Sequence, residues 1–271
     1  MNPLEVLQRT PKSNCGACGY PACLAFAAHV ARSGEDPRKC PYINLDGLAC
    51  DTPGKTPLEQ IAAKHDFDLV HHLQSKIKDL DFHKIAGPLG LSFSAGQDDL
   101  LAFSYLGQHV LLSKKQILMD GKEPEDPRDQ ILLYNYIHSR GGNPPSGTWT
   151  GLESLPNSIS KSKTLATYCE ERLSLLFTGL DSEAIYAFCG KIGGRAVAGS
   201  SATAAAIIPV LPRLPQQLLF WDAEPADGFA ARTKILFDQN VLTYLDLESL
   251  VFSAERLADR LVFLFSQSKQ Q

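Results

Sequence analysis

The chain has 271 residues, of which 44% are hydrophobic and 21% are charged, as in an ordinary globular protein. This length allows one large domain, or a small domain followed by a medium-sized one. The net charge of -4 and the isoelectric point near 6.0 argue against a nucleic-acid-binding protein, which usually carries a basic surface.

The sequence has no features of a secretion signal or a membrane anchor. The first residues, MNPLEVLQRTPKS, lack an apolar core of signal-peptide length, and no stretch reaches the ~18 apolar residues of a membrane span. We therefore expect a cytoplasmic protein without a membrane span. In that compartment thiols stay reduced and structural disulfides are rare.

Four cysteines lie close together near the N-terminus, in NCGACGYPACLAFAAHVARSGEDPRKCP. Cys15, Cys18, Cys23 and Cys40 have the spacing C-x2-C-x4-C-x16-C, and Pro41 follows the last of them. Such clustering in a reduced compartment predicts a metal centre. The total of 7 cysteines is odd, which does not suit a fully paired set of disulfides.

The spacing favours a 4Fe-4S cluster over a single zinc ion, although zinc and no metal remain alternatives. Zinc sites with four cysteines usually contain two C-x2-C pairs, whereas this segment has one. We expect Cys23 to begin a helix, which would place a positive dipole end beside an anionic cluster. Gly16 and Gly19 would let the backbone turn tightly and offer N–H donors to sulfur.

Two domains are expected, residues 1–50 and residues 58–271. In the first, a helix over Ala22–Ser33 should end at Gly34, and the remainder should be loops. A segment rich in proline, glycine and threonine, Cys50–Pro57, predicts the linker.

The second domain has the pattern of an α+β fold with a mainly antiparallel sheet. Helices are expected in Pro57–Leu80, from Asp126 to Arg140, and from Asp246 onwards. Two further helices are expected over Lys161–Phe177 and Ser182–Ile192. Strands are expected at Leu89–Ser94, Leu100–Tyr105, His109–Ser113, Ala205–Leu211, Gln217–Asp222 and Thr233–Phe237. Between them, Asn143–Pro156 should be a loop.

The cysteine segment resembles the small iron-sulfur domain of the corrinoid iron-sulfur protein large subunit and of the Rnf complex B subunit. The resemblance is carried by CGACGYPAC, the alanine-rich helix, Gly34 and Cys40-Pro41, over about residues 10–45. It implies that Cys15, Cys18, Cys23 and Cys40 each bind one iron of a low-potential 4Fe-4S cluster.

The rest of the chain resembles uncharacterised domains of anaerobic bacteria and archaea that often follow this cluster domain. The resembling stretches are Gly147–Pro156 (GTWTGLESLP) and Leu218–Asp238 (LLFWDAEPADGFAARTKILFD). This resemblance implies no activity, so whether the chain is an enzyme stays open. The part after the cluster domain is too short for the barrel and corrinoid domain of the corrinoid protein.

Other residues that could carry chemistry each have a simpler structural explanation. Cys50 suits a linker better than a fifth ligand, and Cys169 and Cys189 suit buried helix positions. A solvated helix residue is the simpler account of His29, and solvated carboxylates of a hairpin loop are the simpler account of Asp222, Glu224 and Asp227. Trp149 suits a core anchor of its loop at least as well as a residue that covers a pocket. Three candidates remain. His83 lies in a stretch that nearly matches the signature of histidine-ligated corrinoid proteins, and His71 and His72 form an adjacent pair. The glycine-rich run Gly190–Ser201 lacks the P-loop pattern.

The sequence therefore predicts an iron-sulfur protein of anaerobic metabolism that passes single electrons to a partner protein or a bound cofactor. One alternative is a redox enzyme, or a corrinoid- or tetrapyrrole-binding protein, with its ligand in the second domain. Another is a protein whose cluster is structural or is transferred onward.

Overall fold

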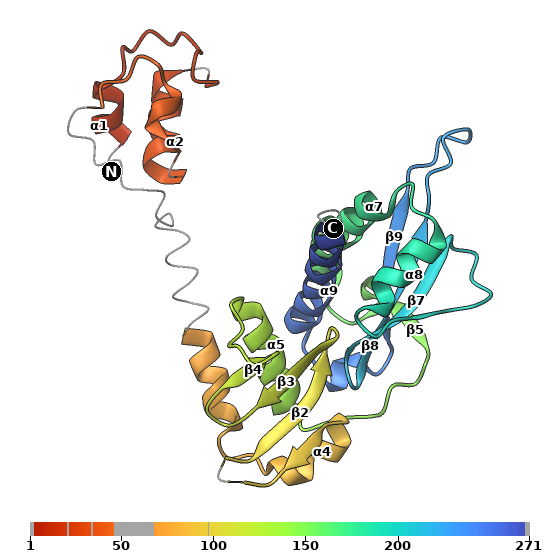
Figure 1. Cartoon of the computed structure of the whole chain (residues 1–271). Coiled ribbons are helices and arrows are strands. Elements are labelled where there is room, and N and C mark those ends of the chain that lie inside the picture. Colours follow the sequence, from red (N-terminus) through yellow and green to blue (C-terminus); the bar gives the residue numbers. More distant parts are fainter. Residues whose placement is uncertain (1–2, 21, 34, 46–67, 97, 269–271) are drawn as a thin grey trace. The chain divides into compact units, whose positions relative to one another are not determined.

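The computed structural model describes all residues except 1–2, 21, 34, 46–67, 97 and 269–271 (Figure 1). The chain divides into two compact units, Met1–Asp68 and Leu69–Gln271. The linker expected at Cys50–Pro57 lies outside the described residues, and so does the first part of the helix expected from Pro57.

The described part of the N-terminal unit contains two short helices, a 3-10 turn and, between the helices, a loop that carries Cys15 and Cys18. The helices are α1 (Pro3–Gln8) and α2 (Cys23–Ser33), and the 3-10 turn η1 spans Pro37–Lys39. The helix expected over Ala22–Ser33 is thus confirmed. The two helices pack on each other around a small core made of Val6, Phe26, Ala27, Val30 and Cys40.

The C-terminal unit begins with two helical segments, residues 68–77 and α4 (Phe82–Leu89), and continues into a four-stranded antiparallel sheet. The strands follow chain order: β1 (Ser92–Ser94), β2 (Leu100–Tyr105), β3 (Gln108–Leu112) and β4 (Ile117–Met119). Alternate residues of β2 are buried, as expected for a sheet with one covered face. Helix α5 (Pro127–His138) lies on that face, since the Tyr105 hydroxyl donates to Asp129 at 2.7 Å.

A second antiparallel sheet has five strands in the order β5-β9-β8-β7-β6. Its strands are β5 (Trp149–Gly151), β6 (Arg195–Ala196), β7 (Ala204–Leu211), β8 (Leu214–Trp221) and β9 (Arg232–Asp238). The expected long hairpin is confirmed, because Leu218 of β8 is opposite Ile235 of β9.

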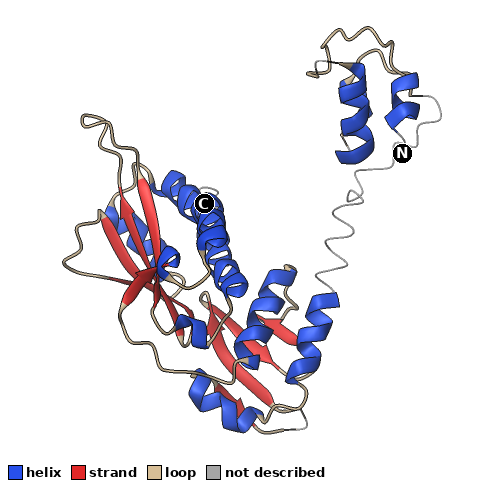
Figure 2. Cartoon of the chain, turned by 180° about the vertical axis from the view of Figure 1, so that it is seen from behind, coloured by secondary structure: helices blue, strands red, loops and turns tan. Residues whose placement is uncertain are grey.

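Helices cover the buried face of this second sheet (Figure 2). They are α6 (Ile159–Leu165), the π-helical turn η3 (Ala166–Glu170), α7 (Glu171–Phe177), α8 (Ser182–Gly190) and α9 (Leu247–Ser268). Gln216 of β8 is wholly buried and donates to Ser253 of α9 at 2.6 Å. The Thr233 N–H of β9 donates to Ser174 of α7 at 2.8 Å, so α7 and α9 lie on the same face. Two further 3-10 turns are η2 (Leu152–Ser154) and η4 (Val241–Thr243).

The two sheets meet at the turn between β2 and β3. Leu106 and Gly107 both have positive φ, 48° and 76°, as a tight two-residue hairpin requires. The Leu106 N–H donates to the Val210 carbonyl of β7 at 3.2 Å, and the buried apolar residues around both sheets form one continuous core.

The α+β class with antiparallel strands is confirmed, but several elements differ from the sequence prediction. Helix α4 was not expected, and it includes Leu89, the first residue of the strand expected at Leu89–Ser94; Gly87 and Pro88 lie in its last turn, before the left-handed Gly90. The short strands β4, β5 and β6 were not expected either. The predicted loop Asn143–Pro156 contains β5, and the predicted helix Lys161–Phe177 is interrupted by η3. Among the described residues, no helix is long and apolar enough to cross a membrane.

Candidate iron-sulfur site

The loop before α2 is shaped by residues in the left-handed conformation. Asn14, Gly16 and Gly19 have φ of 50°, 72° and 84°. The Gly19 N–H donates to the Gly16 carbonyl at 2.9 Å, which closes a tight turn around Cys18. The Asn14 side chain accepts a hydrogen bond from the Cys23 N–H at 2.8 Å, so the start of the loop is attached to the start of the helix.

The four cysteines differ in exposure. Cys15 is exposed and Cys18 half-buried, whereas Cys23 and Cys40 are buried. Cys40 belongs to the small core, and Cys18 packs against that same core. Both are free thiols in this structure, as are the other cysteines that it describes.

The local hydrogen bonds favour a thiolate at Cys15. The Ala17 N–H and the Ser13 side chain lower the pKa of the Cys15 thiol below its usual value. Thiolates are the form in which cysteine binds iron or zinc.

A second polar group fixes the return of the chain to Cys40. The Tyr20 hydroxyl donates to Glu35 at 2.7 Å, and Lys39 forms an ion pair with the same carboxylate at 3.0 Å. These two contacts lower the pKa of Glu35 to about 2. The Tyr20 ring packs on His29, at 4.8 Å between centroids. Through this group the segment after Cys18 is attached to the one before Cys40.

Within the described part of the chain, no group of three or more Cys, His, Asp or Glu side chains has the arrangement of a metal site. The four thiols are nevertheless the donor set that an iron-sulfur cluster uses, and they lie on one small unit with left-handed glycines between them. The residues therefore fit such a cluster by their chemistry. The assignment of Cys15, Cys18, Cys23 and Cys40 as its ligands stays a prediction.

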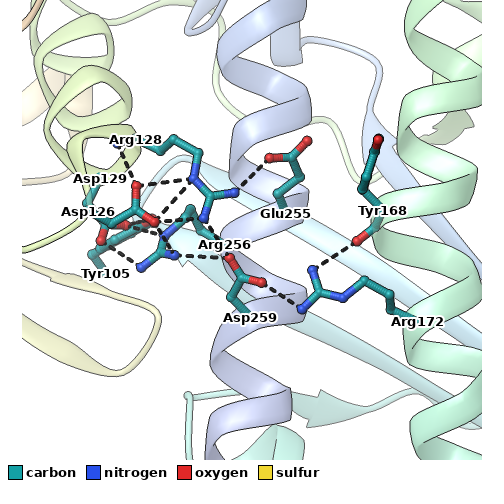
Figure 3. A network of polar contacts seen from close by, with 9 residues as sticks. All are labelled: Tyr105, Asp126, Arg128, Asp129, Tyr168, Arg172, Glu255, Arg256 and Asp259. Carbon is teal, nitrogen blue, oxygen red and sulfur yellow. Dashed lines mark hydrogen bonds and ion pairs between the residues drawn. The ribbon is translucent and has the colours of Figure 1, made fainter. Parts of the chain in front are cut away.

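A polar cluster of the C-terminal unit connects α5, α7 and α9 (Figure 3). Arg256 binds Asp129 through two bonds of 2.7 and 2.8 Å, and Asp129 also accepts from Tyr105. Arg128 and Arg172 both bind Asp259, at 3.0 and 2.8 Å. Asp126 and Glu255 complete the cluster, which we call the arginine–carboxylate network.

Sequence reasoning did not identify this network. Two sequence features belong to the network. Asp126 directly precedes a helix, and charges of opposite sign alternate along one stretch of α9, at Glu255, Arg256 and Asp259. Each is typical of a capping residue or a solvated helix face, and the burial of Asp129, only 3% exposed, follows from long-range packing.

The other cysteines have the structural roles expected of them. Cys169 and Cys189 are buried in the helical layer, and burial raises the pKa of both thiols, that of Cys189 to about 12. Cys50 lies outside the described residues.

The exposed histidines and the remaining candidates form no evident site. His29, His71, His72 and His83 are all exposed, with His83 edge-on to Phe93 at 5.3 Å. The run Gly190–Ser201 begins at the last residue of α8, contains β6 and continues toward β7, so it is a connection from a helix to strands. Trp149 lies in β5 and not in a loop, while Glu224 and Asp227 lie in the exposed β8–β9 hairpin loop. Beside them, Asp222 accepts from the N–H groups of Gly179 and Ala223.

Two family models match different parts of the chain. Residues 81–260 match the family described as "Domain of unknown function (DUF3786)", which is more than half of the chain. The chain belongs to this family. Residues 11–42 match a second family, described as "Putative Fe-S cluster", so the N-terminal unit is an iron-sulfur domain.

Curated relatives match parts of the chain. It is 27% identical over 140 residues to the corrinoid/iron-sulfur protein large subunit of Moorella thermoacetica, covering 45% of this chain and 30% of that protein. It is 44% identical over 60 residues to the acetyl-CoA decarbonylase/synthase complex subunit gamma of Archaeoglobus fulgidus, covering 22% and 13%. Identity to the B subunit of the ion-translocating oxidoreductase complex of Pectobacterium carotovorum is 50% over 36 residues, covering 13% and 19%.

The chain thus spans less than a third of the length of each of these relatives. No solved structure matches the chain.

Proposed function

We propose that the N-terminal unit holds one 4Fe-4S cluster on Cys15, Cys18, Cys23 and Cys40 and passes single electrons to a partner protein. The match of residues 11–42 to an iron-sulfur family carries this proposal, since it contains all four cysteines. A bound 4Fe-4S cluster supplies one-electron redox chemistry. Relatives that are subunits of a decarbonylase/synthase and of an oxidoreductase complex support a role within a larger assembly.

Different parts of the N-terminal unit would have different roles in holding the cluster. Gly16 and Gly19 take left-handed conformations, so the backbone turns tightly around Cys18. The buried Cys23 and Cys40 would anchor the inner side of a cluster in the small core. Because Cys15 is exposed, its side of the loop is where we expect a redox partner to approach.

Electron transfer is tested by reducing the full chain with dithionite in the absence of oxygen and recording its EPR spectrum. We expect an S = 1/2 signal that disappears on reoxidation and returns on a second reduction. A cluster that dithionite cannot reduce would instead indicate a structural or transferred cluster.

One observation favours a second candidate function, a corrinoid-linked protein. The match to the corrinoid/iron-sulfur protein large subunit covers 140 residues, far more than the cluster segment alone. If the C-terminal unit binds a corrinoid or another tetrapyrrole, protein purified without oxygen should carry a chromophore beyond the iron-sulfur absorption. If no such chromophore is present, electron transfer to a partner protein remains the proposed function.

A further inference from the structure

A cavity of about 310 Å³ lies in the C-terminal unit, beside the arginine–carboxylate network. Its wall is formed by the β2–β3 hairpin, by α5 and by α9; the lining residues are Tyr105, Leu106, Gln108, Asp129, Arg256, Asp259, Arg260 and Phe263. This volume is at the lower end of the range for small-molecule sites. The cavity is far in sequence from the cysteines and is not explained by the proposed electron transfer.

Three of the four charged groups that line the cavity have strong partners. Asp129 holds Arg256 through two hydrogen bonds, and the Asp259 carboxylate accepts from three arginines. These bonds fix the side chains before any ligand arrives. A rigid polar wall of this kind lowers the entropy cost of binding.

Arg260 is the exception. Its Nε atom is buried without a hydrogen-bond acceptor, and no carboxylate in the described part of the chain forms an ion pair with its guanidinium. Asp120 attracts it from a distance, but that carboxylate already accepts from the His109 N–H and the Gln108 amide. A buried donor without an acceptor is unfavourable, and an anionic ligand that pairs with the guanidinium would offset this cost.

The surroundings indicate the kind of anion. Phe263 is 50% exposed and lies 5.6 Å from the Arg260 guanidinium, so a flat apolar group could pack on its ring. The arginine–carboxylate network contains four carboxylates and three arginines. This excess of negative charge disfavours a ligand that carries two negative charges. A singly charged carboxylate suits this field better than a phosphate does.

We infer that this cavity is a binding site for a small carboxylate with a flat apolar body, whose carboxylate pairs with Arg260 and whose body packs on Phe263. No cluster is needed for this binding, so its test is independent of the proposed electron transfer.

The test is calorimetric titration of the full chain with benzoate, with benzamide as its uncharged analogue and with inorganic phosphate, all at constant ionic strength. We expect benzoate to bind at least about tenfold more tightly than either control probe, the ratio that one charge-assisted bond supplies. Equal binding of benzamide or of phosphate would contradict the inference, as would the absence of benzoate binding at millimolar concentration.

Variants of Arg260 and Phe263 test whether benzoate binds in this cavity. Arg260→Gln should weaken benzoate binding about tenfold or more, Arg260→Lys should retain part of it, and Phe263→Ala should weaken it severalfold. The matched control is Lys163→Gln, which removes a positive charge from an exposed position of α6. Unchanged binding in folded Arg260→Gln, or equal loss in Lys163→Gln, would overturn the assignment. If Arg260→Gln does not fold, the comparison of Arg260→Lys with Lys163→Gln decides.

Discussion

At the scale of single residues, the four N-terminal cysteines differ from the other two described cysteines in their surroundings. Cys18 is half-buried in a loop with left-handed neighbours, whereas Cys169 is wholly enclosed in the helical layer. Both are thiols, yet only Cys18 lies in an accessible loop between residues in the left-handed conformation, which suits a cluster ligand.

Cys18→Ser should therefore abolish the bound cluster, because serine does not replace a thiolate as an iron ligand in this setting. Cys169→Ser is the matched control and should keep the same iron content per folded chain. The measurement is iron and sulfide per chain after anaerobic purification. Equal iron in both variants would contradict the ligand assignment.

Asp129 is the most deeply buried carboxylate of the arginine–carboxylate network, and it bonds both Arg256 and Tyr105. Replacing it with asparagine leaves the Arg256 charge without its main partner. We expect Asp129→Asn to lower the free energy of unfolding by about 3–5 kcal/mol, measured by urea denaturation. Asp98→Asn, which breaks the exposed ion pair with Lys115, should cost at most about 1 kcal/mol. Similar losses in the two variants would show that the network is not a buried stabilising element.

The sequence indicated candidate site residues where those residues lie close together in the chain. Cysteine spacing and glycine placement indicated the cluster segment, because all of its proposed ligands lie within 26 consecutive residues, Cys15 to Cys40. Asp129 and Arg256 lie far apart in sequence, so their pairing depends on how α5 meets α9 and could not be predicted from local patterns.

At the scale of elements, the β2–β3 turn is the point where the two sheets join. A Cβ placed on Gly107 would lie 2.9 Å from the Ile192 Cα and the Lys191 carbonyl, both of them backbone atoms. Gly121 also has positive φ, 82°, but a Cβ there meets nothing within 4 Å. The two glycines therefore share the conformational requirement and differ in the space around them.

Gly121→Ala should destabilise the protein by roughly 1–2 kcal/mol, the cost of a left-handed alanine. Gly107→Ala should cost about 1–3 kcal/mol more, because the α8–β6 connection must move to make room. Thermal or urea unfolding measures both. Equal effects would mean that the α8–β6 connection can move away from Gly107 without loss of stability.

Long elements with clear periodicity were predicted well, and short ones were not. Helix α9 and strand β2 have apolar residues at regular spacing, and the expected Leu100–Tyr105 agrees with the observed strand. Helix α4 was not predicted from the sequence. Its Pro88 lies close to the end of the helix, where Gly90 ends it, and Asp81 caps the start. Strands of two or three residues, such as β6, have no pattern of their own and form because a neighbouring strand offers free backbone groups.

At the scale of the whole molecule, the two units differ in how much apolar core supports them. In the described part of the N-terminal unit, the buried cluster consists of Val6, Phe26, Ala27, Val30 and Cys40, whereas the C-terminal unit has a core that extends across both sheets. Small domains with so little core usually depend on a metal or on disulfides.

Removing the iron with a chelator should therefore unfold the N-terminal unit and leave the C-terminal unit intact. Limited proteolysis should then degrade the region of the cysteines and leave a stable fragment that begins near residue 69. The thermal unfolding midpoint of that fragment should be the same with and without iron. Protection of the cysteine region in iron-free protein would show that its core suffices alone.

The most direct test of the account is the metal content of the full chain purified without oxygen. A cluster bound by Cys15, Cys18, Cys23 and Cys40 predicts about four irons and about four acid-labile sulfides per chain. One zinc and no sulfide per chain would contradict it.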